Sequence, residues 1–173
     1  MRPYFEKMPS FGKALKENRI ARTQESRAKL EAVEAEIAGL RKAKENVGIP
    51  AAEINKRGSL TVWQRLEYLV DPGTWHPLHS LYNPADNAEG STNVVDGLGR
   101  IGGRWAVIIG FDNKWLAGAW VPGQSENILR VTDIAKRLHL PLVWFVHCSG
   151  VQLPAQEKFY ADRRGGGTCF FRH

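Results

Sequence analysis

Cysteine is scarce in this sequence of 173 residues, which contains only Cys148 and Cys169. Two cysteines cannot form the disulfide framework on which small secreted domains depend. The N-terminal stretch MRPYFEKMPSFGKALKENR also lacks the apolar segment of a secretory signal peptide. We therefore expect the protein in a reducing cytoplasm.

Long hydrophobic runs are absent as well. The two longest, AVIIGF and LPLVWFV, are far too short to cross a bilayer as a helix. The hydrophobic fraction of 43% is nevertheless ordinary for a globular protein and excludes general disorder. A chain of this length is expected to form one domain, with or without an appended arm.

Acidic residues are outnumbered, because 24 Lys and Arg face 18 Asp and Glu. The net charge of +6 allows polyanionic ligands, including nucleic acid, an anionic membrane surface or a phosphorylated cofactor. A basic nucleic-acid-binding module is therefore one alternative. We disfavour it, because the basic residues cluster mainly on the N-terminal arm and no series of spaced aromatic residues offers a stacking platform.

The first fifty residues differ in kind from the rest. Residues 24–46 place four apolar residues at three-and-four spacing among charged ones: Leu30, Val33, Ile37 and Leu40. This pattern predicts a helix with one narrow apolar stripe, which should pack on the main domain or on a partner subunit. We divide the chain into an N-terminal arm, residues 1–54, and a domain, residues 55–173. An assembly helix attached to a degenerate domain is a further alternative.

A capping box begins the first predicted helix of the domain. Thr61 and Gln64 have the required spacing, and the helix should end at Asp71 because Pro72 disfavours helical geometry in the residue before it. Its buried face is expected to contain Val62, Trp63, Leu66, Leu69 and Val70.

Strands are predicted for most of the remaining sequence. TWHPLHSLY is expected to form a short strand, and two β-rich segments flank Gly102-Gly103, a dipeptide suited to a hairpin turn. A helix should follow up to His139, and the apolar run of residues 140–147 predicts a strand buried on both faces. The fold class is therefore α/β.

Two glycine-rich stretches invite a nucleotide-binding interpretation. GLGRIG, residues 97–102, matches the dinucleotide fingerprint, but strand-forming residues follow where the mechanism needs a helix, so we assign these glycines to the hairpin. RRGGGT, residues 163–168, lacks the ending of a phosphate-binding loop. Arg163 and Arg164 can still pair with phosphates while the glycines admit a ligand to the backbone, but a flexible surface loop explains the same residues equally well.

His147 and Cys148 end the apolar run and invite a nucleophile interpretation. Neighbouring side chains on a strand point to opposite faces, so the two cannot form a base–thiol pair. We expect a packed histidine, a small buried thiol and no metal site. The small CSG turn is more informative, because backbone N–H groups at the carboxyl edge of a sheet can form half of an oxyanion hole.

Three longer segments carry a family resemblance: NKRGSLTVWQRLEYLVDPGTW (55–75), DNKWLAGAWVPGQSENILRVTDIAKRLHLPLVWFVHCSGV (112–151) and QEKFYADRRGGGTCFFR (156–172). The first is similar to the opening signature of the biotin-dependent acyl-CoA carboxyltransferases, Asn-x-Arg-Gly-x-Leu-Thr followed by a helix and Asp-Pro-Gly-Ser. The other two, with MPSFGK near the N-terminus, resemble one branch of that family, the α subunits of glutaconyl-CoA decarboxylases.

The resemblance implies a crotonase-like fold of repeated strand–strand–helix units. It implies that the carboxyl group of glutaconyl-CoA moves to biotin on a carrier subunit and leaves crotonyl-CoA. The implied partners are this carrier, a membrane-bound subunit that pumps sodium ions, and a second copy of the full-length subunit. The location would be cytoplasmic, peripheral to the inner membrane. Carboxyltransferases of propionyl-, methylmalonyl- or methylcrotonyl-CoA type are the alternative within the family.

The resemblance also implies roles for individual residues. The backbone N–H groups of Gly150 and Val151 match the family's first oxyanion donors. NKWLAGA matches a segment that lies near CoA. The expected substrate-binding residues are Lys114, Ala117, Gly118, Ser149, Arg163, Arg164, Gly165 and Gly166.

The chain also departs from the family pattern. A full α subunit runs to several hundred residues, and this sequence lacks the later turn that supplies the second oxyanion donor as well as the biotin-facing domain. Cys169 stands where the branch more often has proline. We therefore expect an incomplete N-terminal domain that is inactive and poorly soluble by itself, because strands that lack their neighbours expose their edges.

Overall fold

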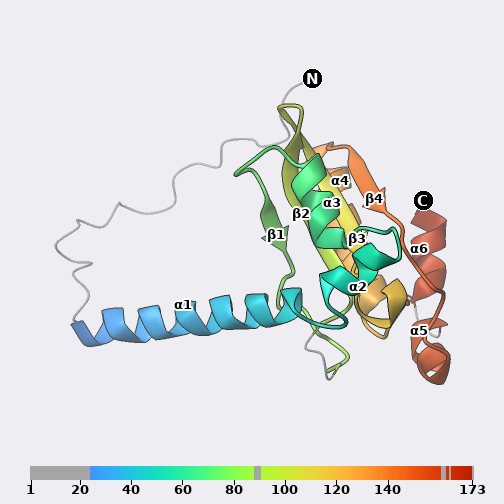
Figure 1. Cartoon of the computed structure of the whole chain (residues 1–173), viewed down its shortest axis with the longest axis horizontal. Coiled ribbons are helices and arrows are strands. Elements are labelled where there is room, and N and C mark those ends of the chain that lie inside the picture. The colour runs from blue at the N-terminus through green and yellow to red at the C-terminus, as the bar shows by residue number, and fades with distance from the viewer. Residues whose placement is uncertain (1–23, 88–90, 161–162, 164, 173) are drawn as a thin grey trace. The chain divides into compact units, whose positions relative to one another are not determined.

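A four-stranded sheet organises residues 43–173 in the computed structural model (Figure 1). In spatial order its strands are β1 (His76–Leu78), β2 (Val94–Ile101), β3 (Arg104–Phe111) and β4 (Leu142–Phe145). The pairs β1–β2 and β2–β3 are antiparallel, whereas β4 runs parallel to β3. The predicted hairpin is confirmed, because Gly102 and Gly103 have the positive φ angles, +57° and +80°, that a two-residue turn between twisted strands requires.

The structure describes residues 24–87, 91–160, 163 and 165–172. The chain divides into two compact units, residues 1–42 and 43–173. The α-helices within the described residues are α1 (Gln24–Glu45), α2 (Ala51–Lys56), α3 (Val62–Leu69), α4 (Gln124–Leu138), α5 (Gln156–Tyr160) and α6 (Gly166–Arg172). Short 3-10 turns occupy Leu116–Gly118 and Leu153–Ala155.

The helix predicted in the N-terminal arm is confirmed as α1. Arg27 and Glu31, one helical turn apart, form an exposed ion pair with a distance of 3.4 Å between Nε and Oε1. On this helix Leu30 is 38% exposed, and both Val33 and Leu40 are 50% exposed.

The capping box of α3 is also confirmed. Thr61 Oγ1 accepts the Gln64 N–H at 3.2 Å, and Gln64 Oε1 accepts the Thr61 N–H at 3.0 Å. Asp71 lies beyond the helix, and its carboxylate accepts the N–H groups of Gly102 and Gly103 in the hairpin turn. One face of the sheet is covered by α3, in a core formed by Val62, Leu66, Val70, Val95 and Ile108.

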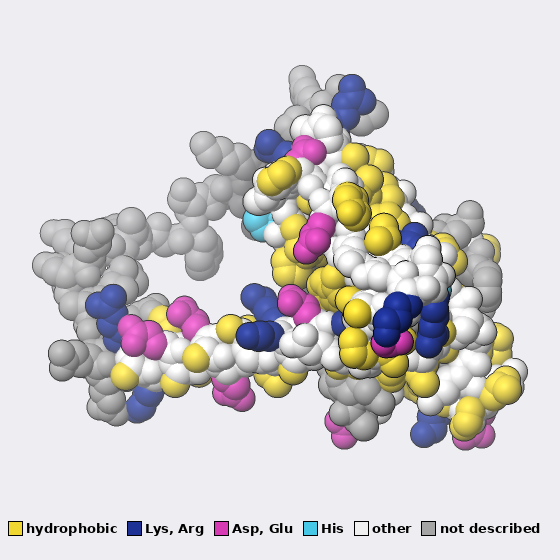
Figure 2. All heavy atoms as spheres, in the orientation of Figure 1, with side chains coloured by type: hydrophobic (Ala, Val, Ile, Leu, Met, Phe, Trp, Pro, Cys, Tyr) yellow, Lys and Arg dark blue, Asp and Glu magenta, His cyan; other side chains and the backbone are white. Residues whose placement is uncertain are grey.

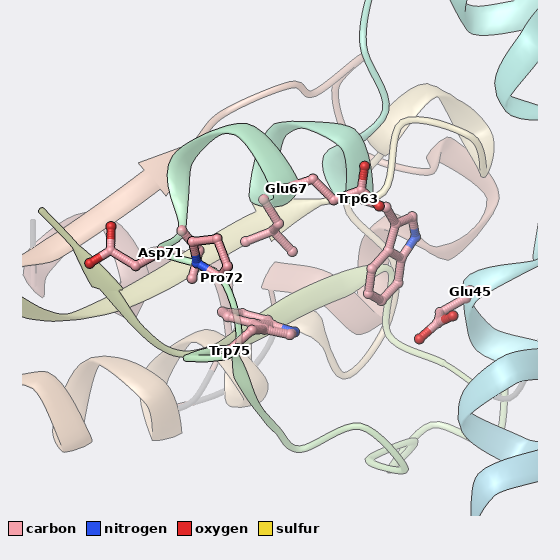
Figure 3. Close-up of a pocket in the computed structure, with 9 residues that line it drawn as sticks. Glu45, Trp63, Glu67, Asp71, Pro72 and Trp75 are labelled. Carbon is pink, nitrogen blue, oxygen red and sulfur yellow. The ribbon is translucent and has the colours of Figure 1, made fainter. Parts of the chain in front are cut away.

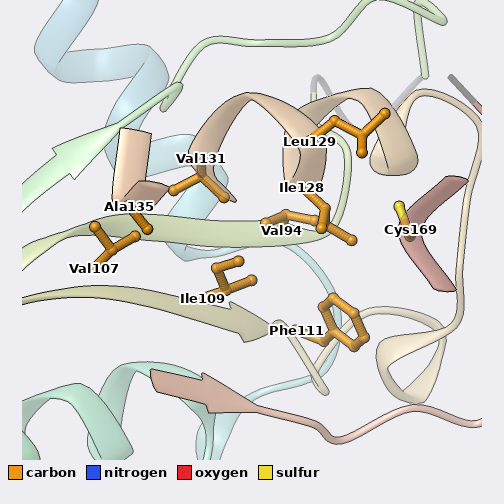
Figure 4. Close-up of a cluster of buried hydrophobic side chains, with 9 residues drawn as sticks. All are labelled: Val94, Val107, Ile109, Phe111, Ile128, Leu129, Val131, Ala135 and Cys169. Atoms are coloured by element: carbon orange, nitrogen blue, oxygen red, sulfur yellow. The ribbon is translucent and has the colours of Figure 1, made fainter. Parts of the chain in front are cut away.

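The opposite face of the sheet is covered by α4 (Figure 4). Side chains alternate along β3, so that Val107 and Ile109 contact the α4 core while Ile108 between them contacts the α3 core. The larger core also includes a cysteine from α6, and its buried members are Val94, Val107, Ile109, Phe111, Ile128, Leu129, Val131, Ala135 and Cys169.

The last strand is less buried than its apolar sequence predicts. All four residues of β4 are only half-buried, and Val146 just beyond them is 69% exposed. The reason is that β4 is the outer strand of the sheet and pairs only with β3 among the described residues. Burial on both faces, as predicted for residues 140–147, is therefore wrong for this structure.

Hairpin β2–β3, helix α4 and strand β4 follow one another as a strand–strand–helix–strand unit. This arrangement confirms the predicted mixed α/β class. Among the described residues, no helix combines the length and the apolar character that crossing a membrane requires.

Candidate functional site

Two segments that stand out in the sequence meet at one edge of the sheet. They follow β3 and β4, and because these strands are parallel, both segments leave the sheet at the same edge. Trp120 and Val151 then form a parallel bridge. The Trp120 N–H donates to the Gly150 carbonyl at 2.8 Å, and the Gln152 N–H donates to the Trp120 carbonyl at 2.9 Å. Backbone hydrogen bonds therefore hold the two segments side by side.

The segment after β3 contains a left-handed turn. Leu116, Ala117 and Gly118 have φ angles of +48°, +50° and +74°. Non-glycine residues in such conformations cost about 1–3 kcal/mol each, and they persist where surrounding contacts hold them. One such contact comes from the other segment, because Ser149 Oγ donates to the Leu116 carbonyl at 2.9 Å. The strain marks this turn as a candidate functional element.

Gly118 is the point where the two segments approach most closely. A Cβ atom at this position would lie 1.9 Å from the His147 carbonyl oxygen, which no side chain tolerates without movement of the backbone. The positive φ of Gly118 favours glycine independently. The sequence-predicted residues Gly118 and Ser149 are thus both contact points between the two segments.

Asn93 supports the turn from the interior. It is buried with a φ of +63°, a conformation that asparagine adopts more readily than most residues. Its Nδ2 donates to the Ala119 carbonyl at 2.9 Å, and its own carbonyl accepts the Asp112 N–H at 3.0 Å. Sequence reasoning missed this residue, because an asparagine just before a strand has no feature that separates it from an ordinary turn residue.

The bridge determines which backbone donors of the second segment remain available. Its two hydrogen bonds use the carbonyl of Gly150 and the N–H of Gln152, so the N–H of Val151 points to the other side of the backbone. Within the described part of the chain, that N–H has no acceptor. The Gly150 N–H instead approaches Cys148 Sγ at 3.2 Å. Of the two amides predicted as donors, Val151 is the better placed to meet a ligand.

Cys148 differs from its predicted environment. The thiol is half-buried, not fully buried, because it lies inside the turn and interacts with the backbone of Gly150 through both the N–H and the carbonyl. His147 is also half-buried. No group of three or more His, Cys, Asp or Glu side chains that could hold a metal ion occurs in the part of the chain that the structure describes.

Lys114 has an internal position. Its Nζ donates to the backbone carbonyl of Glu45 and lies 3.9 Å from Asp112 Oδ2. Its own carbonyl accepts the Ile49 N–H at 3.0 Å, so it connects the end of α1 to the candidate site. Burial raises the pKa of Asp112, and the Lys114 N–H and ammonium partly offset this effect. A contact between Lys114 and CoA stays a prediction.

Gly166 of the RRGGGT stretch packs on an aromatic ring. Gly165 and Gly166 are buried, and a Cβ at Gly166 would lie 2.3 Å from the Phe159 ring. That ring is 5.0 Å from the ring of Trp120, between their centroids. A surface position is therefore wrong for these two glycines: Gly166 begins α6 against Phe159, and Gly165 just before it is buried as well. Arg163 is exposed, and Arg164 lies outside the described residues.

A hollow of about 460 Å³ lies beside α3 (Figure 3). The indole rings of Trp63 and Trp75 border it, and Glu45 faces Trp63. Glu67 also lines it, so carboxylates accompany an otherwise apolar wall. Such a lining disfavours phosphate groups. We therefore do not assign the hollow to a phosphorylated ligand.

Basic side chains gather elsewhere on the same face. Figure 2 shows Lys and Arg side chains over α2, where Lys56 and Arg57 are exposed. The connection from α2 to α3 contacts the candidate site, because Asn113 Nδ2 donates to the Leu60 carbonyl at 3.0 Å. Lys56 is paired with Glu53, with 2.7 Å between Nζ and Oε1, so the basic side chains here are accompanied by an acidic one. These residues were not distinguished in the sequence, where the basic residues of α1 are more numerous.

Buried charges connect α1 to the sheet. Lys44 Nζ donates to the Val94 carbonyl at 2.9 Å. Burial lowers the pKa of Lys44, and Asp96 and Asp112 act in the opposite direction. Burial likewise raises the pKa of Asp96, whose Oδ1 lies 3.0 Å from His79 Nδ1. The charges of this cluster compensate one another only in part.

The chain matches the carboxyl transferase domain over residues 53–173. It belongs to the carboxyl transferase domain family. The chain is 51% identical over 170 residues to the glutaconyl-CoA decarboxylase subunit alpha of Acidaminococcus fermentans. The match covers 98% of this chain and 28% of that protein. Identity to the biotin-dependent 3-methylcrotonyl-coenzyme A carboxylase beta1 subunit of Mycobacterium tuberculosis is 30% over 119 residues, which covers 66% of this chain and 22% of the relative. The chain thus spans less than a third of the length of either relative.

Solved structures confirm the predicted fold of the carboxyl transferase domain. The beta subunit of P. aeruginosa geranyl-CoA carboxylase superposes with a TM-score of 0.66 at 27% identity, covering 87% of this chain and 30% of that one. Transcarboxylase 12S superposes with a TM-score of 0.65 at 20% identity, covering 80% of this chain and 27% of that one. The fold is the crotonase-like fold of these carboxyltransferases, of which this chain forms part.

We expect Gly118→Ala to lower the free energy of unfolding by more than Gly103→Ala. Both glycines have similar φ angles, +74° and +80°, so each alanine has a conformational cost of about 1–2 kcal/mol. A Cβ at Gly103 meets nothing within 4 Å, whereas one at Gly118 meets the His147 carbonyl. Urea unfolding of both variants measures the difference. Equal losses of unfolding free energy would show that the segment after β4 moves away from the added Cβ without cost, and this would contradict the tight contact between Gly118 and the His147 carbonyl.

Replacement of Asp96 by Asn should change how stability depends on pH. Burial makes the pKa of Asp96 higher in the folded protein than in the unfolded chain. At pH values between these two pKa values, the folded protein therefore binds more protons than the unfolded chain. The stability that this group contributes is present at low pH and lost as the pH rises through the folded pKa. Relative to wild type, Asp96→Asn should gain stability as the pH rises above about 4, the usual pKa of this carboxyl in an unfolded chain. Urea unfolding across this range checks it, with the exposed Glu157→Gln as control; a pH-independent difference contradicts it.

Proposed function

We propose that this chain is the acyl-CoA-binding part of the carboxyltransferase subunit of a glutaconyl-CoA decarboxylase. One observation carries the proposal. The match to the Acidaminococcus fermentans subunit covers 98% of the chain, and so includes most residues before the carboxyl transferase domain, which starts at residue 53. The methylcrotonyl-CoA relative matches only 66% of the chain at lower identity.

The proposed reaction breaks the bond between the terminal carboxylate and the carbon chain of glutaconyl-CoA. The carboxyl group passes to biotin, and the electron pair stays on the substrate as a dienolate whose charge collects on the thioester oxygen. Uptake of a proton at carbon then gives crotonyl-CoA. The chemistry required of this chain is therefore stabilisation of an oxyanion, which a single well-placed N–H donor provides at about 3–4 kcal/mol.

The Val151 N–H is the donor that we propose for this oxygen. It points away from the bridge to Trp120, and the bridge holds the backbone on both sides of it. Rigid placement matters, because a donor fixed before the reaction needs no reorganisation as the charge develops. Gly150 contributes through its φ of +113°, which gives the backbone a bend that other residues rarely adopt.

The thioester would then lie against the left-handed turn. Ala117 and Ser149 are exposed beside Val151 and are proposed substrate contacts, whereas the buried Gly118 maintains the spacing. The exposed Lys56 and Arg57 would attract the phosphates of CoA, as would Arg163 and Arg164. Gly166 would support this surface through its packing on Phe159, and the buried Gly165 precedes it in the chain.

Partners supply the remaining chemistry of the proposed reaction. Biotin, attached to a carrier subunit, is the carboxyl acceptor, and no residue of this chain is assigned to it. A membrane-bound subunit would decarboxylate biotin and export sodium ions, which makes the location cytoplasmic and peripheral to the membrane. A second copy of the complete subunit would complete the assembly.

Val151→Pro should reduce kcat for carboxyl transfer by about 10²–10³-fold, because proline has no N–H to offer the oxyanion. The matched variant Val151→Ala keeps the N–H and should retain nearly full activity. Steady-state kinetics of the complete subunit with glutaconyl-CoA measure both effects. A Val151→Pro protein with an unchanged unfolding midpoint and an unchanged kcat would refute the assignment of this donor.

A comparison of substrates tests the proposed function itself. The complete subunit should show a higher kcat/KM for glutaconyl-CoA than for malonyl-CoA or methylmalonyl-CoA. A preference for either of the other thioesters would assign the chain to another acyl-CoA carboxyltransferase. Retention on nucleic acid that exceeds retention on immobilised CoA would exclude both assignments.

A further inference from the structure

Leu116 is an exposed apolar residue in an otherwise buried segment. Trp115 before it and Ala119 after it are each 8% exposed, whereas Leu116 is 45% exposed. Ala117 is exposed as well, so the left-handed turn presents two apolar side chains to the outside. A single exposed leucine is ordinary on most protein surfaces. This one lies beside the proposed oxyanion donor, on a backbone that is costly to form.

The backbone conformation of Leu116 is its second unusual feature. Its φ angle is +48°, in the left-handed region where a bulky side chain is a genuine outlier. Glycine or asparagine adopts this conformation at a lower cost. Strained residues of this kind gather at active sites and ligand contacts. Nothing in the backbone geometry favours a leucine here, so the side chain is the feature that a function would use.

Hydrogen bonds hold the strained backbone in place. The Leu116 carbonyl accepts the Ala119 N–H at 3.0 Å and the Ser149 hydroxyl at 2.9 Å. The Trp115 carbonyl accepts the Gly118 N–H, also at 3.0 Å. The turn is thus fixed by its own backbone and by the segment that follows β4. These bonds present the Leu116 side chain from a fixed position.

The proposed donor lies on the segment that holds Leu116. Ser149, which donates to the Leu116 carbonyl, precedes Val151 by two residues. A thioester oxygen at the Val151 N–H brings the attached carbon chain to the side of the turn. In glutaconyl-CoA this chain is apolar between the thioester and the terminal carboxylate, which suits an aliphatic side chain. An apolar contact also excludes water, and this strengthens the hydrogen bond to the oxyanion.

We propose that Leu116 is a specificity-determining residue whose side chain contacts the carbon chain of the bound acyl group. The proposal rests on the proposed acyl-CoA chemistry and adds a residue that no motif in the sequence singled out. A contact with hydrocarbon selects for chain length, because a two-carbon acyl group leaves the leucine uncovered. Groups that contact only the CoA part of the ligand do not distinguish acyl chains in this way.

Binding of two thioesters to the complete subunit tests the contact. Crotonyl-CoA carries four acyl carbons and acetyl-CoA carries two, on the same CoA. Leu116→Gly should weaken the binding of crotonyl-CoA by about tenfold, because an apolar contact is lost. The affinity for acetyl-CoA should stay nearly unchanged. Calorimetric titration measures both dissociation constants.

The outcomes separate this proposal from the proposed function. Equal weakening of both thioesters would place Leu116 against CoA itself and overturn the proposal, as would unchanged binding of crotonyl-CoA. In either case the proposed function stands, because the wild-type subunit still binds acyl-CoA. A wild-type subunit that binds neither thioester would overturn the proposed function and the role of Leu116 with it.

Two further variants separate the side chain from the backbone. Leu116→Asn keeps a side chain of similar size that suits the left-handed conformation, so its loss of crotonyl-CoA binding should match that of Leu116→Gly. Wild-type affinity in Leu116→Asn would show that an apolar contact is not what Leu116 provides. Leu81→Gly removes a leucine of almost equal exposure, 43%, outside the two segments, and should leave both affinities unchanged. Urea midpoints of the Leu116 variants should stay close to wild type, because relief of strain offsets lost packing.

Discussion

The close approach of Gly118 to the His147 carbonyl determines the arrangement of the candidate site. Only glycine fits at this position, because a Cβ atom would lie 1.9 Å from that oxygen. The approach lets Trp120 pair with Val151, and this pairing in turn directs the Val151 N–H away from the protein backbone. One steric constraint thus links a strained turn to the orientation of a single donor.

Several buried polar groups keep this arrangement in place. Asn93 holds the carbonyl side of the turn, and Asp112 accepts N–H groups from Trp63 and Lys114. The Lys114 ammonium donates to the Glu45 carbonyl at the end of α1, so this charged group makes its hydrogen bond within the protein. Burying charged groups is costly, and burial accordingly raises the pKa of Asp112 and lowers the pKa of the nearby Lys44. In return, these polar groups support the ordered backbone at the edge of the sheet.

Local signals in the sequence predicted the elements, and long-range contacts explain where prediction failed. The capping box of α3, the Gly102-Gly103 hairpin and the stripe of α1 depend on neighbours in sequence, and all are confirmed. The burial of β4 depends on its place at the edge of the sheet, which an apolar run does not reveal. Asn93 and Lys44 act on residues far away in sequence, so composition and spacing gave no reason to select them. The resemblance of three segments supplied the family, which the domain match confirms, while the roles of individual site residues remain predictions.

The central claim is that the Val151 N–H meets the thioester oxygen of a bound acyl-CoA. The most direct measurement is the ¹H–¹⁵N chemical shift of the Val151 amide during titration with crotonyl-CoA and, separately, with free CoA. If the claim is correct, crotonyl-CoA moves the Val151 proton downfield, as expected for a new hydrogen bond, whereas CoA without an acyl group leaves it in place. A Val151 resonance that stays unchanged while crotonyl-CoA shifts other residues would contradict the account.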